Sequence, residues 1–397
     1  MNLDPSNPAL RVAPGDQRAV AHLVTPYLFL TGGWIHTQLV HNRSFRPVVI
    51  TQATENETVF PFSPVYNLGN PRAQDGVRRA DPLWTLVSKY LLGQFPAEPY
   101  RAIYEREKVD LIHAHLGWEG ARTVMTATEP KRPFVVSFYG RDAGMLPRSA
   151  YWRALYTRLW KHADRFIAEG PFMGETLVKI GAPADRIRVV HLGIPLEQFR
   201  FAERSVPPGN APIIGLIAAS FREKKGIPFA LQAFARIARR HPRVRLRIIG
   251  DGPQRAQIEQ LARGPELAGR VDLLGYQPPA VYRAELERAH FFMAPSVTAA
   301  DGDSEGGAPV CLLEAQAVGL PVVATVHCDI PEVTRENQSA FLAPERNVEA
   351  LALRLDDLLS DPARWPRMGR AGRAHIEEEF DIVRQVERMN EVYRELL

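Results

Sequence analysis

Short apolar runs alternate with longer segments of helical periodicity along the first half of the chain. The apolar runs, typical of buried strands, span residues 18–25, 47–51, 109–113, 134–138 and 166–168. A helix is expected to start over residues 34–41. A longer one is expected over 82–107, with apolar positions at Leu83, Leu86, Val87, Tyr90 and Leu91. Strands separated by helix-length segments predict parallel β-α-β units.

The same alternation restarts after a segment at 201–212 whose Pro-Pro-Gly-Asn sequence is typical of a linker. Further strands are predicted at 213–218, 244–249, 271–274, 291–295 and 321–325, and helices at 228–240, 308–318 and 362–397. Two parallel halves predict an α/β protein of two Rossmann-like domains. We place them at residues 1–205 and 206–379, with a final helix at 380–397.

Composition supports a folded protein and narrows its partners. The chain has 397 residues, 45% of them hydrophobic and 24% charged, which suits two or three packed domains. Two cysteines cannot form a disulfide framework, and the polar start shows no signal core, so we expect a cytoplasmic protein. A net charge of +4 fits an anionic lipid or a nucleotide diphosphate. Without an arginine-rich tail or zinc-finger spacing, nucleic acid is not expected.

The segment from Glu305 to Thr325 carries the most chemistry. Gly306 and Gly307 lack side chains, so their N–H groups can approach a ligand closely. A turn of this kind before a helix favours anionic or hydroxyl-rich ligands. Glu314 lies about two turns into the predicted helix, whose other residues are mostly apolar, and a carboxylate there is costly unless it is paired or binds something. The alternative is an ordinary helix with a surface glutamate at its start.

A basic turn follows the first strand of the second half. It contains Ser220, Arg222 and Lys225 and ends at Gly226. Cations between a strand and a helix suit a diphosphate, because lysine supplies a point charge and arginine a planar fork. The alternative is a solvated basic turn.

These two stretches resemble the donor site of retaining glycosyltransferases of family 4, which have the GT-B fold of two Rossmann-like domains facing across a cleft. The resemblance implies that Glu305 orients the transferred sugar and Glu314 holds the ribose. Eight residues separate the two glutamates, one more than is usual in the family, so the turn of Gly306, Gly307, Ala308 and Pro309 looks expanded. Ser220 stands where the family has arginine, and Arg222 and Lys225 would face the diphosphate.

Other segments extend the resemblance, which is strongest over 213–331. Residues 248–253 match a strand-to-loop turn, and Tyr276 and Gln277 lie where the family holds the base, although both could equally be surface loop residues. In GT-B proteins the last helix crosses back onto the first domain, which residues 380–397 could do.

The first half resembles the acceptor side of that family. Leu30–His36 is similar to its first glycine-rich loop, in which Gly33 approaches the ligand. His115, at the end of a strand, matches a histidine that touches the donor sugar. Residues 138–142 resemble Phe-His-Gly-x-Asp, with Tyr139 in place of the histidine and Asp142 retained. Trp118 is placed on the same acceptor side.

Three secondary interpretations depend on spacing. His113 and His115 share one strand face and could meet one metal ion, but the sequence shows no third ligand. Asp301 and Asp303 form an Asp-x-Asp pattern that we interpret as a hydrogen-bonded turn, since the family needs no catalytic metal. The basic, aromatic segment 151–166 is either a helix that rests on an anionic membrane or, more simply, a core helix with a solvated face.

The predicted function is therefore retaining transfer of a sugar from a nucleotide-diphosphate sugar to a hydroxyl. Glu305, His115 and Lys225 are the expected catalytic residues, and no cofactor or metal is expected. The expected acceptor is a glycan or a lipid-linked glycan, by analogy with bacterial polysaccharide enzymes. The alternatives are another GT-B enzyme, such as a nucleotide-sugar epimerase or a sugar phosphorylase, and a non-catalytic nucleotide-sugar-binding module.

Overall fold

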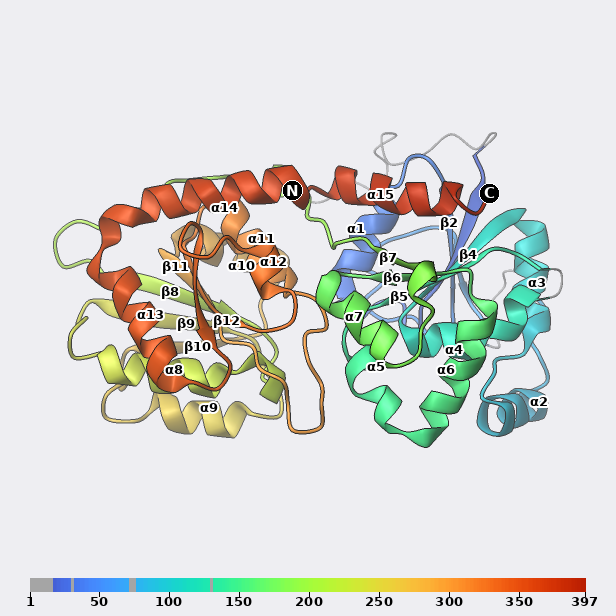
Figure 1. The fold of residues 1–397 in the computed structure, drawn as a ribbon, viewed down its shortest axis with the longest axis horizontal. Coiled ribbons are helices and arrows are strands. Elements are labelled where there is room, and N and C mark those ends of the chain that lie inside the picture. Colours follow the sequence, from blue (N-terminus) through green and yellow to red (C-terminus); the bar gives the residue numbers. More distant parts are fainter. Residues whose placement is uncertain (1–16, 30–31, 71–75, 129–130) are drawn as a thin grey trace. The chain divides into compact units, whose positions relative to one another are not determined.

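A computed structural model describes residues 17–29, 32–70, 76–128 and 131–397. The chain divides into two compact units (Figure 1). The first comprises Met1–Gly193 and Ile382–Leu397, and the second Ile194–Asp381. Within the described residues, no helix combines the length and the apolar character that crossing a membrane requires.

The first unit is built on a seven-stranded parallel sheet of order β3-β2-β1-β4-β5-β6-β7. Its strands are β1 (Ala19–Leu23), β2 (Arg46–Thr51), β3 (Val65–Asn67), β4 (Val109–His115), β5 (Phe134–Phe138), β6 (Arg165–Ala168) and β7 (Ile187–Val189). Its helices are α1 (Gly33–His41), α2 (Pro82–Val87), the π-helical η3 (Ser88–Leu92), α3 (Ala97–Arg106), α4 (Gly117–Thr128), α5 (Arg141–Gly144), η4 (Leu146–Arg148), α6 (Ala150–His162), α7 (Pro171–Lys179), η5 (Ala184–Arg186) and α15 (Ile382–Arg394).

Both faces of this sheet are covered, which explains why its central strands are continuous apolar runs. Along β1, Ala21 and Leu23 belong to the core that includes residues of α3, α4, α6 and α7. Val20 points to the opposite face and packs in a cluster with Met389 and Val392 of α15.

The second unit repeats this plan with a six-stranded parallel sheet of order β10-β9-β8-β11-β12-β13. Its strands are β8 (Ile213–Ala218), β9 (Val244–Ile249), β10 (Val271–Gly275), β11 (Phe291–Ala294), β12 (Val322–Val326) and β13 (Ala340–Pro344). Its helices are η6 (Leu196–Gln198), η7 (Glu223–Lys225), α8 (Ile227–Ile237), α9 (Arg255–Ala262), α10 (Pro279–Arg288), α11 (Val310–Ala317), α12 (Ile330–Val333), α13 (Val348–Ser360), η8 (Pro362–Arg364) and α14 (Trp365–Glu379).

The division between the units lies earlier in the chain than residue 205. Arg204 is buried and belongs to the second unit, where its guanidinium donates hydrogen bonds to the carbonyls of Glu287 and Val318 at 2.7 and 2.9 Å. The segment 201–212 is therefore not a free linker. At the other end, Phe380 packs in the core of the second unit, and the first unit resumes at Ile382.

Two predicted helices are broken in the structure. The segment 82–107 divides because Gly93 adopts a left-handed conformation (φ 65°) after η3 and Pro96 precedes α3. The segment 362–397 divides into η8, α14 and α15. In addition, α11 begins at Val310 rather than at residue 308, so Glu314 lies about one turn into it.

Candidate functional site

The candidate donor-site residues of the second unit follow the carboxyl ends of its central parallel strands. The basic turn follows β8, and the loop that contains Glu305 follows β11. Gly226 ends the basic turn in a left-handed conformation (φ 61°), and a Cβ on it would lie 1.8 Å from the carbonyl oxygen of Pro295. The two loops are therefore in direct contact, which needs glycine at this position.

Lys225 and Glu305 form a buried ion pair where these loops meet. The Lys225 ammonium donates to Glu305 Oε2 at 2.8 Å, and the Ser296 hydroxyl donates to Glu305 Oε1 at 2.7 Å. Burial alone would raise the pKa of the Glu305 carboxyl. The ammonium groups of Lys225 and Lys224 outweigh that effect and hold this pKa at about 2. Glu305 is therefore a fixed negative charge at neutral pH.

The neighbouring lysine shapes the same loop. Lys224 donates to the Asp303 carboxylate at 3.1 Å and to the carbonyl of Ser304 at 2.9 Å. The backbone N–H of Asp303 donates to Asp301 Oδ1 at 2.9 Å, which confirms the hydrogen-bonded turn expected for this Asp-x-Asp pair.

His327 holds the Glu305 loop through a backbone hydrogen bond. It was not identified as a site residue from the sequence. The backbone N–H of Glu305 donates to His327 Nε2 at 3.1 Å, so the ring proton lies on Nδ1, which is 2.5 Å from Glu345 Oε1. The Glu345 carboxylate also accepts from the N–H of Thr298. Only its place directly after β12, at the ligand end of the sheet, could have marked this histidine.

Glu314 lies on α11 and is held by a second residue that the sequence did not indicate. The Tyr282 hydroxyl of α10 donates to Glu314 Oε2 at 2.5 Å. Burial raises the pKa of the Glu314 carboxyl, although this hydrogen bond opposes the shift. Cys311, one turn earlier on the same helix, has its thiol pKa raised to about 12 by burial, so it is not a thiolate nucleophile.

The remaining donor-side candidates are less enclosed. Gly306, Gly307 and Pro309 are buried, Ala308 and Ser220 are partly buried, and Arg222 is exposed. Tyr276 is exposed, and its hydroxyl donates to the carbonyl of Asp251 at 3.0 Å; Gln277 donates to the carbonyl of Leu274. Tyr276 thus touches the turn after β9, whereas the hydrogen bond to Glu314 comes from Tyr282.

The acceptor-side candidates of the first unit gather around buried histidines. His115 has one ring nitrogen 2.7 Å from the Tyr139 hydroxyl and the other 2.9 Å from Nδ1 of His22. Burial lowers the pKa values of His22 and His115, so both rings are neutral. Because its two nitrogens are engaged by protein groups, His115 is placed to hold Tyr139 in position. Direct contact with a sugar stays a prediction.

His22 on β1 completes a group of three histidines with His113 and His115. The sequence alone did not reveal this third member. The ligand atoms of His22, His113 and His115 lie within 4.8 Å of one another, which is an arrangement able to surround a metal ion. However, the nitrogens of His113 are bonded to the hydroxyls of Tyr393 and Ser137 at 2.6 and 2.7 Å. With these hydrogen bonds, the three histidines form a buried polar cluster that connects α15 to the sheet.

Asp142 is fully buried and has a structural partner for each carboxylate oxygen. It accepts from the backbone N–H of Gly117 at 2.7 Å and of Tyr139 at 3.0 Å. Gly33 begins α1, and the adjoining Trp34 lies beside Tyr139, with ring centroids 5.7 Å apart. Trp118 is partly buried in the first turn of α4. Leu30 and Thr31 of the predicted loop lie outside the described residues.

Glu119, next to Trp118, is a further titratable group that the sequence did not indicate. Burial raises the pKa of its carboxyl to about 7, while a hydrogen bond from Thr25 opposes the shift. A carboxyl with this pKa exchanges protons near neutral pH.

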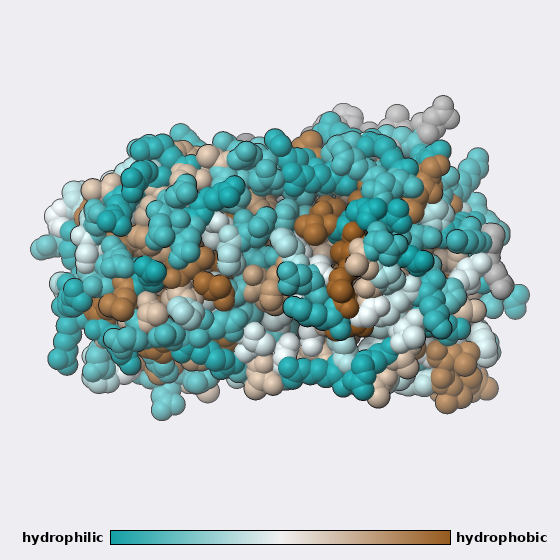
Figure 2. All heavy atoms as spheres, in the orientation of Figure 1, coloured by the Kyte–Doolittle hydropathy of each residue, from teal (hydrophilic) through white to brown (hydrophobic). Residues whose placement is uncertain are grey.

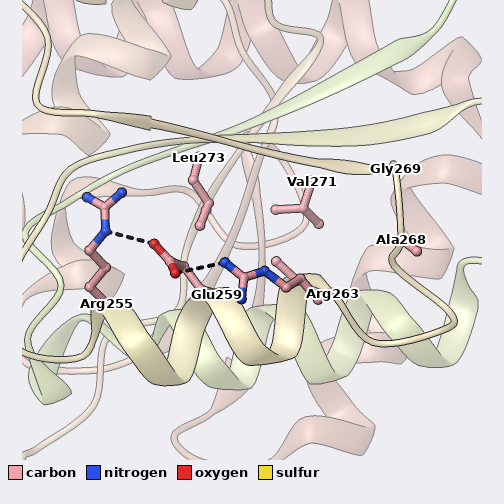
Figure 3. Close-up of a pocket in the computed structure, with 8 residues that line it drawn as sticks. Arg255, Glu259, Arg263, Ala268, Gly269, Val271 and Leu273 are labelled. Carbon is pink, nitrogen blue, oxygen red and sulfur yellow. Dashed lines mark hydrogen bonds and ion pairs between the residues drawn. The ribbon is translucent and has the colours of Figure 1, made fainter.

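A hollow between α9 and β10 lies apart from these residues (Figure 3). Glu259 accepts from Arg255 at 2.8 Å and from Arg263 at 3.1 Å across it. Its charges are mutually paired, and none of the candidate donor residues lines it, so we do not assign it to the site.

Two family models match most of the chain. The family described as Glycosyl transferases group 1 matches residues 199–375, and Glycosyltransferase Family 4 matches residues 36–198. AmsK of Erwinia amylovora, an amylovoran biosynthesis glycosyltransferase, is 33% identical over 276 residues, which are 68% of this chain and 67% of AmsK. WcaL of Escherichia coli (strain K12), named for colanic acid biosynthesis, is 33% identical over 68% of this chain and 64% of its own length. The alignments thus span about two thirds of these relatives.

Solved structures match the whole fold at low sequence identity. HepE of Anabaena, in complex with UDP-glucose, aligns with a TM-score of 0.75 at 18% identity, covering 95% of this chain and all of that one. A sucrose-phosphate synthase of Thermosynechococcus elongatus aligns with a TM-score of 0.74 at 19% identity, covering 96% and 99%. The two family matches and the similarity to AmsK, together with two Rossmann-like units that align with solved GT-B structures, place the chain in the group 1 (family 4) glycosyltransferases of GT-B fold.

Proposed function

We propose that this protein transfers a sugar from a nucleotide-diphosphate sugar to a hydroxyl group, with retention of anomeric configuration. The observation that carries the proposal is the buried Lys225–Glu305 pair, which stands beside the Gly306–Gly307 turn at the ligand end of the second sheet. The family membership supports the reaction class. The UDP-glucose complex of HepE supports a nucleotide-sugar donor.

In the proposed reaction, the bond between the anomeric carbon and the diphosphate oxygen breaks, and the acceptor hydroxyl oxygen bonds to that carbon. The nucleoside diphosphate takes the electron pair of the broken bond, and the hydroxyl proton passes to its departing oxygen. Lys225 stabilises the negative charge that develops on the diphosphate. Glu305, ionised at neutral pH, orients the sugar and faces its developing oxocarbenium character. Glu314 binds the ribose hydroxyls.

The acceptor is proposed to be a glycan or a lipid-linked glycan in bacterial polysaccharide synthesis. The names of AmsK and WcaL support this substrate class. In the first unit, Trp118 and Tyr139 would offer aromatic surfaces of the kind that bind sugar rings. Tyr139 is partly buried as a residue, and its ring lies beside those of Trp34 and His115.

Calorimetry with UDP, GDP, ADP and TDP tests the donor class. We expect one nucleoside diphosphate to bind, and we expect Glu314→Ala to weaken that binding at least tenfold through the loss of its ribose contact. Glu336→Ala, at an exposed position of the same unit, is the matched control and should bind as the wild type does. Absence of binding by any nucleotide to the folded protein would contradict the proposal.

A further inference from the structure

A run of exposed apolar side chains covers α2 and η3 of the first unit. Leu91 is 79% exposed and Leu83 is 69% exposed. The other exposed members of this patch, which we call the α2–η3 patch, are Trp84, Leu86, Tyr90 and Leu92. Figure 2 shows a brown cluster at the lower right, where Figure 1 places α2. So many large apolar groups gathered on one short segment mark an interaction surface.

The segment is held by local polar hydrogen bonds, and no residue of α2 is buried. Asp81 caps α2 by accepting from the N–H groups of Leu83 and Trp84 at 2.9 and 3.0 Å. Ser88, the buried residue of η3, donates to the carbonyl of Gln94 at 2.9 Å. The fold therefore presents the α2–η3 patch without using it in the core.

The patch adjoins the first turns of α6. A Cβ on Gly93, at the end of η3, would lie 2.7 Å from Leu155 and 3.1 Å from the Tyr151 hydroxyl. Leu155 and Leu159 of α6 are buried in the core, so the core-helix interpretation of segment 151–166 is confirmed, and α6 does not supply an apolar face to a membrane.

The chain segments that contain η3 and α6 carry positively charged side chains. Residues 82–97 contain Lys89 and no acidic residue, and residues 145–163 contain no acidic residue either. The basic residues of the second stretch are Arg148, Arg153, Arg158 and Lys161. Asp81, which caps α2, and Glu98 bound the first stretch, and between them its one charged side chain is Lys89. The patch therefore combines apolar groups with nearby cations. An anionic lipid surface uses both, because acyl chains take the apolar groups and headgroups take the cations.

We propose that the α2–η3 patch docks the protein on an anionic phospholipid surface. Leu83, Leu86 and Leu91 enter the headgroup–acyl boundary, and Lys89 with the basic residues of α6 contacts the phosphates. This docking goes beyond the proposed transfer reaction, and it does not depend on the donor site, which lies in the second unit.

Vesicle co-sedimentation of the full chain tests the proposal. We expect binding to phosphatidylcholine vesicles that contain 30% phosphatidylglycerol and at least tenfold weaker binding to phosphatidylcholine alone. The double variant Leu83→Glu/Leu91→Glu should bind the anionic vesicles at least tenfold more weakly than the wild type. The matched control is Leu353→Glu/Val383→Glu, which changes two exposed apolar residues elsewhere and should leave binding unchanged.

Two further readouts separate lipid docking from unfolding of the variants and from dimer formation. Anionic vesicles should shift tryptophan emission to the blue in the wild type, and Trp84→Phe should remove that shift while its melting temperature stays unchanged. Equal vesicle binding by the wild type and Leu83→Glu/Leu91→Glu would overturn the proposal. A wild-type dimer that this variant converts to a monomer, with no vesicle binding, would overturn it too and would assign the patch to a second copy of the chain. The patch variants should bind nucleotide as the wild type does. Loss of vesicle binding can then be told apart from a failure of the proposed transfer reaction.

Discussion

Replacing Lys225 by methionine removes the ammonium and leaves the Glu305 carboxylate buried without its principal partner. The pKa of Glu305 is about 2 in the folded protein against an ordinary value of 4.5, a difference that corresponds to about 3 kcal/mol. Breaking a buried ion pair by removing one partner typically costs about 3–5 kcal/mol, in agreement with that figure. For a unit of this size, each kcal/mol lowers the melting temperature by about 2–4 °C. We therefore expect Lys225→Met to melt roughly 6–12 °C below the wild type at pH 7.5.

The difference in stability between the variant and the wild type is expected to depend on pH. In the wild type, the contribution of the Glu305 carboxylate to stability is present above about pH 4.5 and is lost as the pH falls towards about 2. In Lys225→Met, burial without the ammonium raises the pKa of Glu305, so the carboxyl becomes protonated at a higher pH. The stability gap between variant and wild type should therefore narrow between pH 7.5 and pH 5.

Differential scanning fluorimetry at both pH values measures the gap. The double variant Lys225→Met/Glu305→Gln should recover much of the lost stability, because no unpaired charge remains. Lys179→Met, at an exposed lysine, is the control for the substitution itself. A Lys225→Met protein that melts with the wild type at pH 7.5 would refute the reasoning.

Three further predictions concern the donor site. Gly226→Ala should abolish nucleotide binding measured by calorimetry, because its Cβ would meet the carbonyl oxygen of Pro295; Gly209→Ala, which has a similar φ of +57° but no atom within 4 Å of the new Cβ, should bind normally. Tyr282→Phe should weaken nucleoside diphosphate binding about tenfold, because Glu314 loses the hydrogen bond that orients it; unchanged affinity would argue against a ribose contact. Sugar transfer should persist in excess EDTA, as expected for chemistry that uses lysine rather than a metal; loss of activity that Mg²⁺ restores would contradict this.

The central strands were predictable because both faces of each sheet are buried. Segments such as 134–138 and 213–218 are continuous apolar runs, and the structure has strands there. The edge strands β3, β7 and β13 were not expected. Two of them are only three residues long and only partly buried, so their sequences carry little strand signal.

Segment 82–107 shows that apolar periodicity predicts a helix but does not predict which of its residues are buried. One long helix with regularly spaced apolar residues is predicted there, and in the structure Leu83, Leu86 and Leu91 are exposed. Apolar spacing predicts an amphipathic helix, but it does not reveal what covers the apolar face. Here the left-handed Gly93 ended the helix early and left that face outside the core.

The candidate donor site was predictable only where its residues lie in recognisable sequence motifs. Lys225 and Glu305 occupy recognisable turns and Glu314 lies on the helix that follows the second turn, but further contacts that fix the two glutamates come from elsewhere in the chain. Tyr282 reaches Glu314 from 32 residues away, and His327 reaches the Glu305 backbone from 22 residues away. Such pairings are products of the tertiary fold, and residue spacing does not encode them.

Donor turnover, followed together with the configuration of the new linkage, tests the central claim most directly. Wild-type protein, a panel of nucleotide-diphosphate sugars and glycan acceptors would be incubated, with nucleoside diphosphate release measured and the anomeric proton assigned by NMR. We predict one productive donor, a product that keeps the donor's anomeric configuration, and a loss of rate in Glu305→Gln of about 10²–10³-fold, while Glu336→Gln stays active. Release that is equally fast in Glu305→Gln, or a product of inverted configuration, would contradict the account.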